Sequence, residues 1–119
     1  MNAPLQTQGL TKAYRHVDAL RDLTIEVPQG AVFALVGPNG AGKTTAIKTL
    51  LNIHPPTSGH AEVLGVDSRS LSPAQLAQIG YVSENQQLPE WMTVGRLLSY
   101  RKPFYPAWSD ADAAELIRL

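Results

Sequence analysis

The most informative absences in this sequence are those of cysteine, of net charge and of long apolar runs. No cysteine occurs among the 119 residues, which excludes disulfides and thiolate metal sites and is consistent with a reducing compartment such as the cytoplasm. Ten basic and ten acidic residues cancel, so no basic excess favours nucleic acid as a partner. No stretch approaches the about 20 apolar residues that span a bilayer. Residues 1–6 also lack the basic start and apolar run of a signal peptide. If the protein works at a membrane, we therefore expect another subunit to cross it.

Several short apolar segments predict strands. Leu23, Ile25 and Val27 alternate with polar residues, which is the period of a half-buried strand, and residues 28–30 form a turn after it. The run 31–36 is apolar throughout and ends at a glycine, which predicts a strand buried on both faces, as in a parallel sheet. Further short strands are predicted at 60–64 and 79–82.

Helices are predicted after the glycine-rich segment and again in the second half of the chain. The first passes through Ile47, Leu50 and Leu51 and must stop by His54, because two prolines follow. Two later helices have polar N-caps, Thr93 and Ser109. The predicted later helices span 73–78, 94–100 and 113–119. A helix that runs to the last residue without a cap suggests a chain cut inside a domain.

Residues 37–44 match the phosphate-binding pattern G-x-x-x-x-G-K-[ST] in full, between a predicted strand and a predicted helix. Glycines allow the backbone to curl so that its N–H groups point inward, and the helix N-terminus adds partial positive charge. A lysine then faces the β and γ phosphates, and a hydroxyl faces Mg²⁺. The predicted ATP-binding residues of this phosphate loop are Gly37, Pro38, Asn39, Gly40, Ala41, Gly42, Lys43, Thr44 and, just beyond it, Thr45.

Around this loop the chain resembles the ATP-binding subunit of ABC transporters. The segments that carry the resemblance occur in the family's order and extend from about Leu5 to Leu119. They are Leu10-Thr11-Lys12-Ala13-Tyr14, Asn39 to Thr45, Pro56-Thr57-Ser58-Gly59, Ile79-Gly80-Tyr81-Val82 and Met92-Thr93-Val94. The resemblance implies an α/β fold: a P-loop NTPase core with an antiparallel N-terminal β portion and the start of a helical insert. It implies that residues 1–119 are the N-terminal half of a nucleotide-binding domain, with A-loop, Walker A and Q-loop regions.

The same resemblance implies roles for two further residues. Tyr14 would stack on the adenine, an interaction that adds about 1–3 kcal/mol and depends little on the base. Glu84 stands where the family usually has a glutamine, and its carboxylate would meet Mg²⁺ together with Thr44. In having a glutamate at this position, the chain is similar to bacterial members of the family that serve type-2 export-like membrane subunits. The histidines, including His54, show no metal-ligand spacing and are interpreted as surface or packing residues.

The motifs that the family uses for hydrolysis do not occur in these 119 residues. There is no Leu-Ser-Gly-Gly-Gln signature, no apolar strand ending in Asp-Glu and no switch histidine after one. Phosphoryl transfer depends on positioning and charge stabilisation by such groups. We therefore expect no catalytic residue in this chain and little ATP hydrolysis by it alone, although the family hydrolyses ATP.

The resemblance also implies partners and a location. A complete protein would couple ATP hydrolysis to transport, bound through a transmembrane permease subunit to the cytoplasmic face of the membrane and paired with a second nucleotide-binding subunit. Nucleic acid is not expected as a partner. The alternatives are a P-loop kinase or GTPase, the first half of a non-transport ABC ATPase of DNA repair or translation, and an inactive truncated remnant. The kinase is disfavoured by the 36 residues before Gly37, and the GTPase by the lack of Asn-Lys-x-Asp.

Overall fold

The computed structural model describes residues 3–38, 42–84 and 86–118. The chain divides into two compact units, Met1–Ser72 and Pro73–Leu119. We call them the N-terminal unit and the C-terminal unit and describe each by itself.

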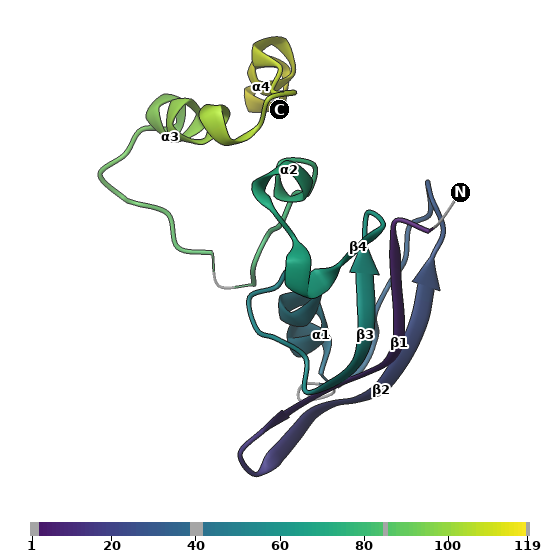
Figure 1. The fold of residues 1–119 in the computed structure, drawn as a ribbon. Coiled ribbons are helices and arrows are strands. Elements are labelled where there is room, and N and C mark those ends of the chain that lie inside the picture. The colour runs from purple at the N-terminus through teal and green to yellow at the C-terminus, as the bar shows by residue number, and fades with distance from the viewer. Residues whose placement is uncertain (1–2, 39–41, 85, 119) are drawn as a thin grey trace. The chain divides into compact units, whose positions relative to one another are not determined.

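The N-terminal unit is built on a four-stranded antiparallel sheet in the order β2-β1-β3-β4 (Figure 1). The strands are β1 (Leu5–Tyr14), β2 (Val17–Val27), β3 (Ser58–Val63) and β4 (Val66–Asp67). β1 and β2 form a hairpin, and β3 pairs with the other edge of β1. The predicted alternation at 23–27 is confirmed as the second half of β2, where apolar residues are half-buried and the polar residues between them are exposed. The strand expected at 60–64 is β3.

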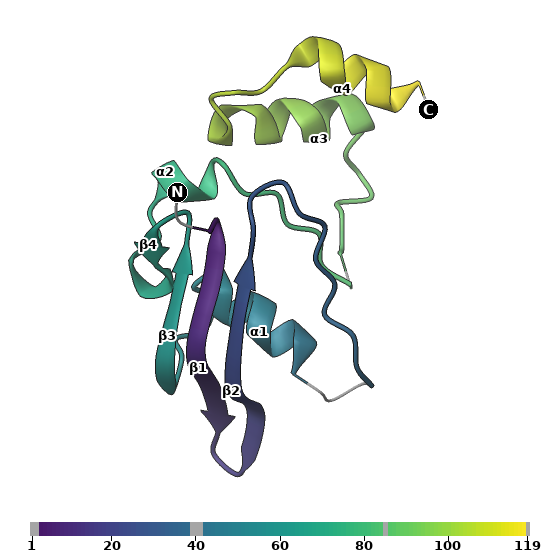
Figure 2. The same ribbon diagram turned by 90° about the vertical axis from the view of Figure 1, so that its right-hand side faces the viewer.

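The helix α1 (Lys43–Leu50) packs against one face of this sheet (Figure 2) and contacts β2 and β3. The contact forms the core of the unit, since α1 buries Ala46, Thr49 and Leu50. The sheet contributes the buried side chains of Leu10, Leu20, Ala61 and Val63. The helix ends before His54 as predicted, and Asn52 after it has a left-handed φ of 59°.

Two predicted strands, 31–36 and 79–82, are not formed in the part of the chain that the structure describes. Val32 is fully exposed and Val36 is 91% exposed, where burial on both faces was expected. A strand needs a hydrogen-bonded neighbour, and neither segment pairs with β1 to β4. An apolar run indicates that a segment suits a buried position, but it does not supply the neighbours that would bury it.

The described residues of the C-terminal unit form the short helices α2 (Pro73–Leu76), α3 (Val94–Arg101) and α4 (Asp110–Ile117). Short 3₁₀ turns span Lys102–Phe104 in this unit and Ser68–Ser70 in the N-terminal unit. Both predicted N-caps are confirmed: Thr93 accepts a hydrogen bond from the N–H of Arg96, and Ser109 from that of Asp112. α4 begins three residues before the predicted start, because the helix follows its cap at once.

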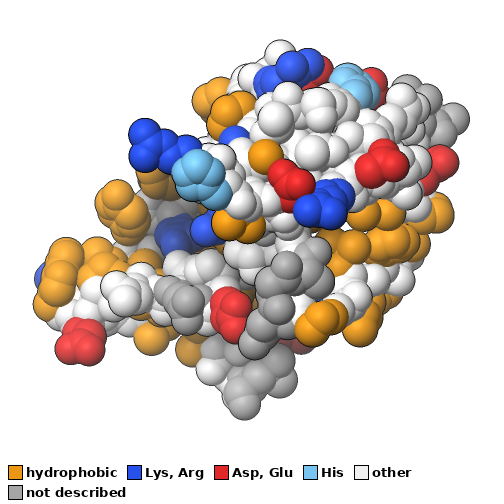
Figure 3. Space-filling model, turned by 90° about the horizontal axis from the view of Figure 1, so that it is seen from below, with side chains coloured by type: hydrophobic (Ala, Val, Ile, Leu, Met, Phe, Trp, Pro, Cys, Tyr) orange, Lys and Arg blue, Asp and Glu red, His pale blue; other side chains and the backbone are white. Residues whose placement is uncertain are grey.

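Many large hydrophobic side chains are exposed, and hydrophobic groups stand beside scattered charged ones on the face seen from below (Figure 3). All the fully buried apolar side chains of the described residues belong to the N-terminal unit. Within the same residues, no helix has the length and apolar character needed to cross a membrane.

Candidate phosphate-binding site

The start of α1 is fixed by Gly42. This residue has a φ of 95°, a left-handed conformation that residues with a Cβ rarely adopt. A Cβ at position 42 would lie 2.4 Å from the carbonyl oxygen of Ala19 in β2. The first helical hydrogen bond then runs from the N–H of Ala46 to the carbonyl of Gly42, at 2.8 Å. The conformation and the close approach both require glycine, so the end of the loop at Gly42 lies directly against β2.

The side chains expected to meet phosphate and Mg²⁺ lie in the first turn of α1. Lys43 is half-buried, and its Nζ donates a hydrogen bond to the carbonyl of Gly37 at the other end of the loop. Thr44 is exposed and Thr45 is half-buried. Asn39, Gly40 and Ala41 lie outside the described residues, and Pro38 is exposed. The side chain of Lys43 therefore connects the first turn of α1 to Gly37, the first residue of the loop.

The N-terminus of α1 differs from those of α3 and α4. Thr93 and Ser109 cap the later helices, and two acidic residues lie in the first turn of α4. α1 has no side-chain cap among the described residues and no acidic residue in its first turn. Its first N–H groups lack intrahelical partners, as in any helix. An uncapped N-terminus with Lys43 beside it suits an anion.

Tyr14 lies at the end of β1, in the hairpin whose second strand meets Gly42. Its side chain is 42% exposed. The Nζ of Lys12 lies over the ring, 5.1 Å from its centroid. His54, from the loop after α1, meets the ring edge to face, with centroids 6.0 Å apart. No pattern in the sequence predicts these neighbours, since His54 lies 40 residues from Tyr14 and the spacing of the histidines indicates only a surface or packing role.

Glu84 is exposed and belongs to the C-terminal unit, whereas Thr44 belongs to the N-terminal unit. The expected joint role of these residues on Mg²⁺ thus stays a prediction. Among the described residues, no group of three or more histidine, cysteine, aspartate or glutamate side chains is placed to hold a metal ion.

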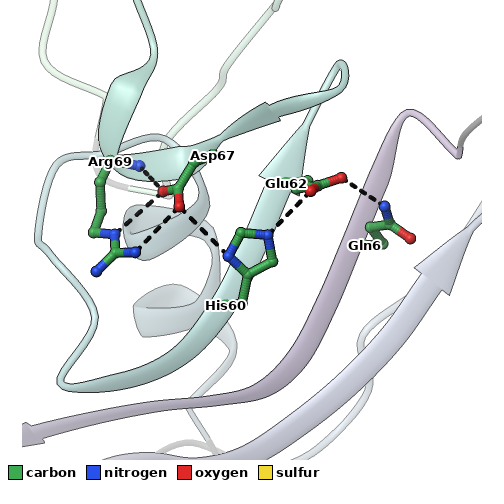
Figure 4. A network of polar contacts seen from close by, with 5 residues as sticks. All are labelled: Gln6, His60, Glu62, Asp67 and Arg69. Atoms are coloured by element: carbon green, nitrogen blue, oxygen red, sulfur yellow. Dashed lines mark hydrogen bonds and ion pairs between the residues drawn. The ribbon is translucent and has the colours of Figure 1, made fainter.

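A polar cluster joins β1, β3, β4 and the 3₁₀ turn that follows β4 (Figure 4). The ring nitrogens of His60 face Glu62 at 3.1 Å and Asp67 at 3.4 Å. Gln6 donates to Glu62 at 2.7 Å, and Arg69 pairs with Asp67 at 3.1 Å. The hydrogen bond with His60, followed by that with Gln6, lowers the pKa of Glu62. The side-chain and backbone hydrogen bonds from Arg69 lower the pKa of Asp67. The cluster therefore favours both carboxylates in their charged form and ties β4 to β3.

The fold and the loop define a P-loop NTPase that carries an antiparallel β portion. One solved structure, described as an ATP-binding subunit of an ABC transporter, superposes with a TM-score of 0.80 at 28% identity. The match covers 95% of this chain and 47% of that one. The family model for ABC transporters matches residues 20–119, so the chain belongs to the ATP-binding proteins of the ABC transporter family.

Curated relatives agree with this assignment. The manganese transport system ATP-binding protein MntB of Bacillus subtilis is 38% identical over 81 residues, which cover 68% of this chain and 31% of MntB. The ribose import ATP-binding protein RbsA of Pseudomonas putida is 37% identical over 103 residues, which cover 84% of this chain and 20% of RbsA. The chain thus spans less than a third of the length of these two relatives.

Proposed function

We propose that this chain binds the triphosphate of Mg-ATP on the phosphate loop, as the nucleotide-binding part of an ABC transporter ATPase. The observation that supports this most is the start of α1: an uncapped helix N-terminus set by Gly42 and followed at once by Lys43. A loop that only turned the chain would need neither the close approach to Ala19 nor a half-buried lysine.

Each residue has one role in this proposal. The backbone of 37–44 holds the β and γ phosphates, and the ammonium of Lys43 adds the full positive charge that a triphosphate requires. In the bound state Lys43 would exchange its hydrogen bond with the Gly37 carbonyl for phosphate oxygens. Thr45 would donate to the α-phosphate, and Tyr14 would stack on the base.

The loop fits Mg²⁺ in its chemistry, because the hydroxyl of Thr44 is exposed in the first turn of α1. Glu84 is the proposed second ligand, directly or through water. When bound, the ion would neutralise charge between the β and γ phosphates. The chain's own contribution is to hold the phosphates and to offer oxygen ligands to the ion.

The activity of a complete protein is a wider proposal. By family it would hydrolyse ATP and couple hydrolysis to transport through a permease subunit at the cytoplasmic face of a membrane. These 119 residues contain no signature motif and no Asp-Glu strand end. We therefore expect them to bind Mg-ATP without measurable release of phosphate.

The test is calorimetry of Mg-ATP with the wild-type chain, Lys43→Ala and the control Lys48→Ala. Lys48 lies in the last turn of the same helix and carries the same charge, so the pair separates loop binding from general attraction. Charge-assisted hydrogen bonds of this kind contribute about 1.5–3 kcal/mol, so we expect Lys43→Ala to weaken binding about 10- to 100-fold.

Circular dichroism must show that both variants remain folded. Equal affinities for the two variants would contradict the assignment of the loop. Phosphate release measured in the same samples should stay at the level of protein-free buffer, and release that Lys43→Ala abolishes would contradict the expected lack of turnover.

A further inference from the structure

The surroundings of Tyr14 point to a device that holds its ring in place. Three groups converge there from segments far apart in the sequence: Lys12 two residues earlier on β1, and His54 and Pro55 from the loop after α1. The Nζ of Lys12 donates a hydrogen bond to the carbonyl of Pro55 at 2.7 Å while it lies 5.1 Å from the Tyr14 centroid. The hydrogen bond to Pro55 thus holds the ammonium group of Lys12 in place beside the Tyr14 ring.

The loop that carries His54 is itself fastened to β1. The N–H of Thr57 donates to the carbonyl of Thr11 at 2.8 Å, and the N–H of Ala13 donates to Thr57 Oγ1 at 2.9 Å. These bonds extend the β1–β3 pairing past its last pair, Thr11 with Ser58. The backbone just before Tyr14 is therefore held by the loop that follows α1.

Gly59 makes this close approach possible. A Cβ at position 59 would lie 2.1 Å from the carbonyl oxygen of Gly9, so only glycine allows β3 to start where it does. The hydrogen-bonded connection between the hairpin and the loop after α1 therefore depends on the glycine at position 59.

We propose that Lys12, with His54, is a positioning residue for the base of the nucleotide: it fixes the Tyr14 ring so that its exposed part is ready to stack. This inference rests on the proposed binding of ATP and deepens it by naming what orders the base-binding end of the site. A free surface tyrosine loses rotamer freedom when a base stacks on it, whereas a ring already held by a cation and a second ring loses less. The attraction between the Lys12 ammonium and the electron-rich face of the ring stabilises this position of the Tyr14 side chain.

The test compares Lys12→Met, which removes the charge and keeps the apolar stem, with Lys12→Arg, which keeps a cation and a donor for Pro55. Lys48→Met is the charge-matched control. From the size of exposed cation–π contacts we expect Lys12→Met to weaken Mg-ATP binding about two- to fivefold and Lys12→Arg to retain it. Tripolyphosphate, which has no base, should bind Lys12→Met as it binds the wild type.

A double-mutant cycle shows whether Lys12 acts through Tyr14. In the Tyr14→Ala background, Lys12→Met should have no further effect on Mg-ATP binding. Three results would overturn the proposal: an unchanged affinity for ATP, an increased affinity because Lys12 competes with the base for the ring, or an equal loss for tripolyphosphate and ATP. A different result would show that the phosphate loop itself is wrongly assigned. In that case the wild-type protein would bind tripolyphosphate no better than Lys43→Ala does.

Discussion

Single residues set the phosphate loop against the sheet, and Gly42 does so most directly. Replacement by alanine would place a Cβ 2.4 Å from the Ala19 carbonyl at a φ of 95°. Gly30 is a matched control, since it has a φ of 78° but open space around the added atom. The left-handed conformation alone costs about 1 kcal/mol for alanine.

We therefore expect Gly30→Ala to lower the free energy of unfolding by about 1 kcal/mol and Gly42→Ala by about 2 kcal/mol or more, because only the second also meets backbone. Urea denaturation followed by circular dichroism measures the difference. Equal losses would show that the loop can move away from Ala19 at no cost.

At the same scale, local patterns predicted where helices start, but they did not predict the neighbours of Tyr14. The Gly-Lys-Thr pattern indicated the start of α1, and the caps Thr93 and Ser109 were recognisable because a cap depends on neighbours within three residues. The contacts of Lys12 and His54 with Tyr14 could not be predicted. They depend on how the loop after α1 meets β1, which no short pattern encodes.

At the scale of elements, the short strand β4 is held by charge as well as by two residue pairs with β3. Glu62 and Asp67 have lowered pKa values in the folded chain, so the unfolded chain binds protons more readily as the pH falls. Their contribution to stability is complete above their ordinary pKa values, and it is lost over the acid range below them, as the pH falls through the lowered pKa values.

We expect the melting temperature of the sheet to fall over this range in the wild type and to fall less steeply in Asp67→Asn. Glu26→Gln is the control, since Glu26 is an exposed residue of β2 that does not belong to the cluster drawn in Figure 4. Thermal unfolding by circular dichroism at several pH values gives the slopes. Parallel slopes for wild type and Asp67→Asn would contradict a role of the cluster in acid stability.

Elements also show where prediction from pattern failed. Residues 23–27 and 31–36 both suit strands, yet only the first has hydrogen-bonded neighbours among the described residues. Periodicity depends on the side chains of one segment, whereas a strand depends on its partner. Phe33 and Leu35 nevertheless line a cavity of about 420 Å³ together with Leu5, Ile25 and Ile47. Part of the apolar run therefore faces other apolar side chains although it forms no strand.

For the whole molecule, the division into two units predicts two separate unfolding transitions. The buried apolar side chains of the described residues lie in the N-terminal unit, and both tryptophans, Trp91 and Trp108, lie in the C-terminal unit. Tryptophan fluorescence thus reports on one unit, and the β signal in circular dichroism on the other.

We expect the fluorescence transition in urea to occur at lower concentration and to be broader than the β transition, because few buried apolar contacts hold the C-terminal unit. Saturating Mg-ATP should raise the midpoint of the β transition more than that of the fluorescence transition. Coincident transitions under both conditions would show one cooperative unit instead of two.

The contact between Gly42 and Ala19 separates two kinds of sequence change. Because the hairpin meets the loop through a main-chain carbonyl, the identity of residue 19 matters little to that contact, and exchanges such as Ala19→Ser should leave nucleotide affinity intact. An insertion or deletion between Tyr14 and Ala19 is different, because it moves another carbonyl into place and displaces the turn. This part of the hairpin can therefore vary in composition but is constrained in length.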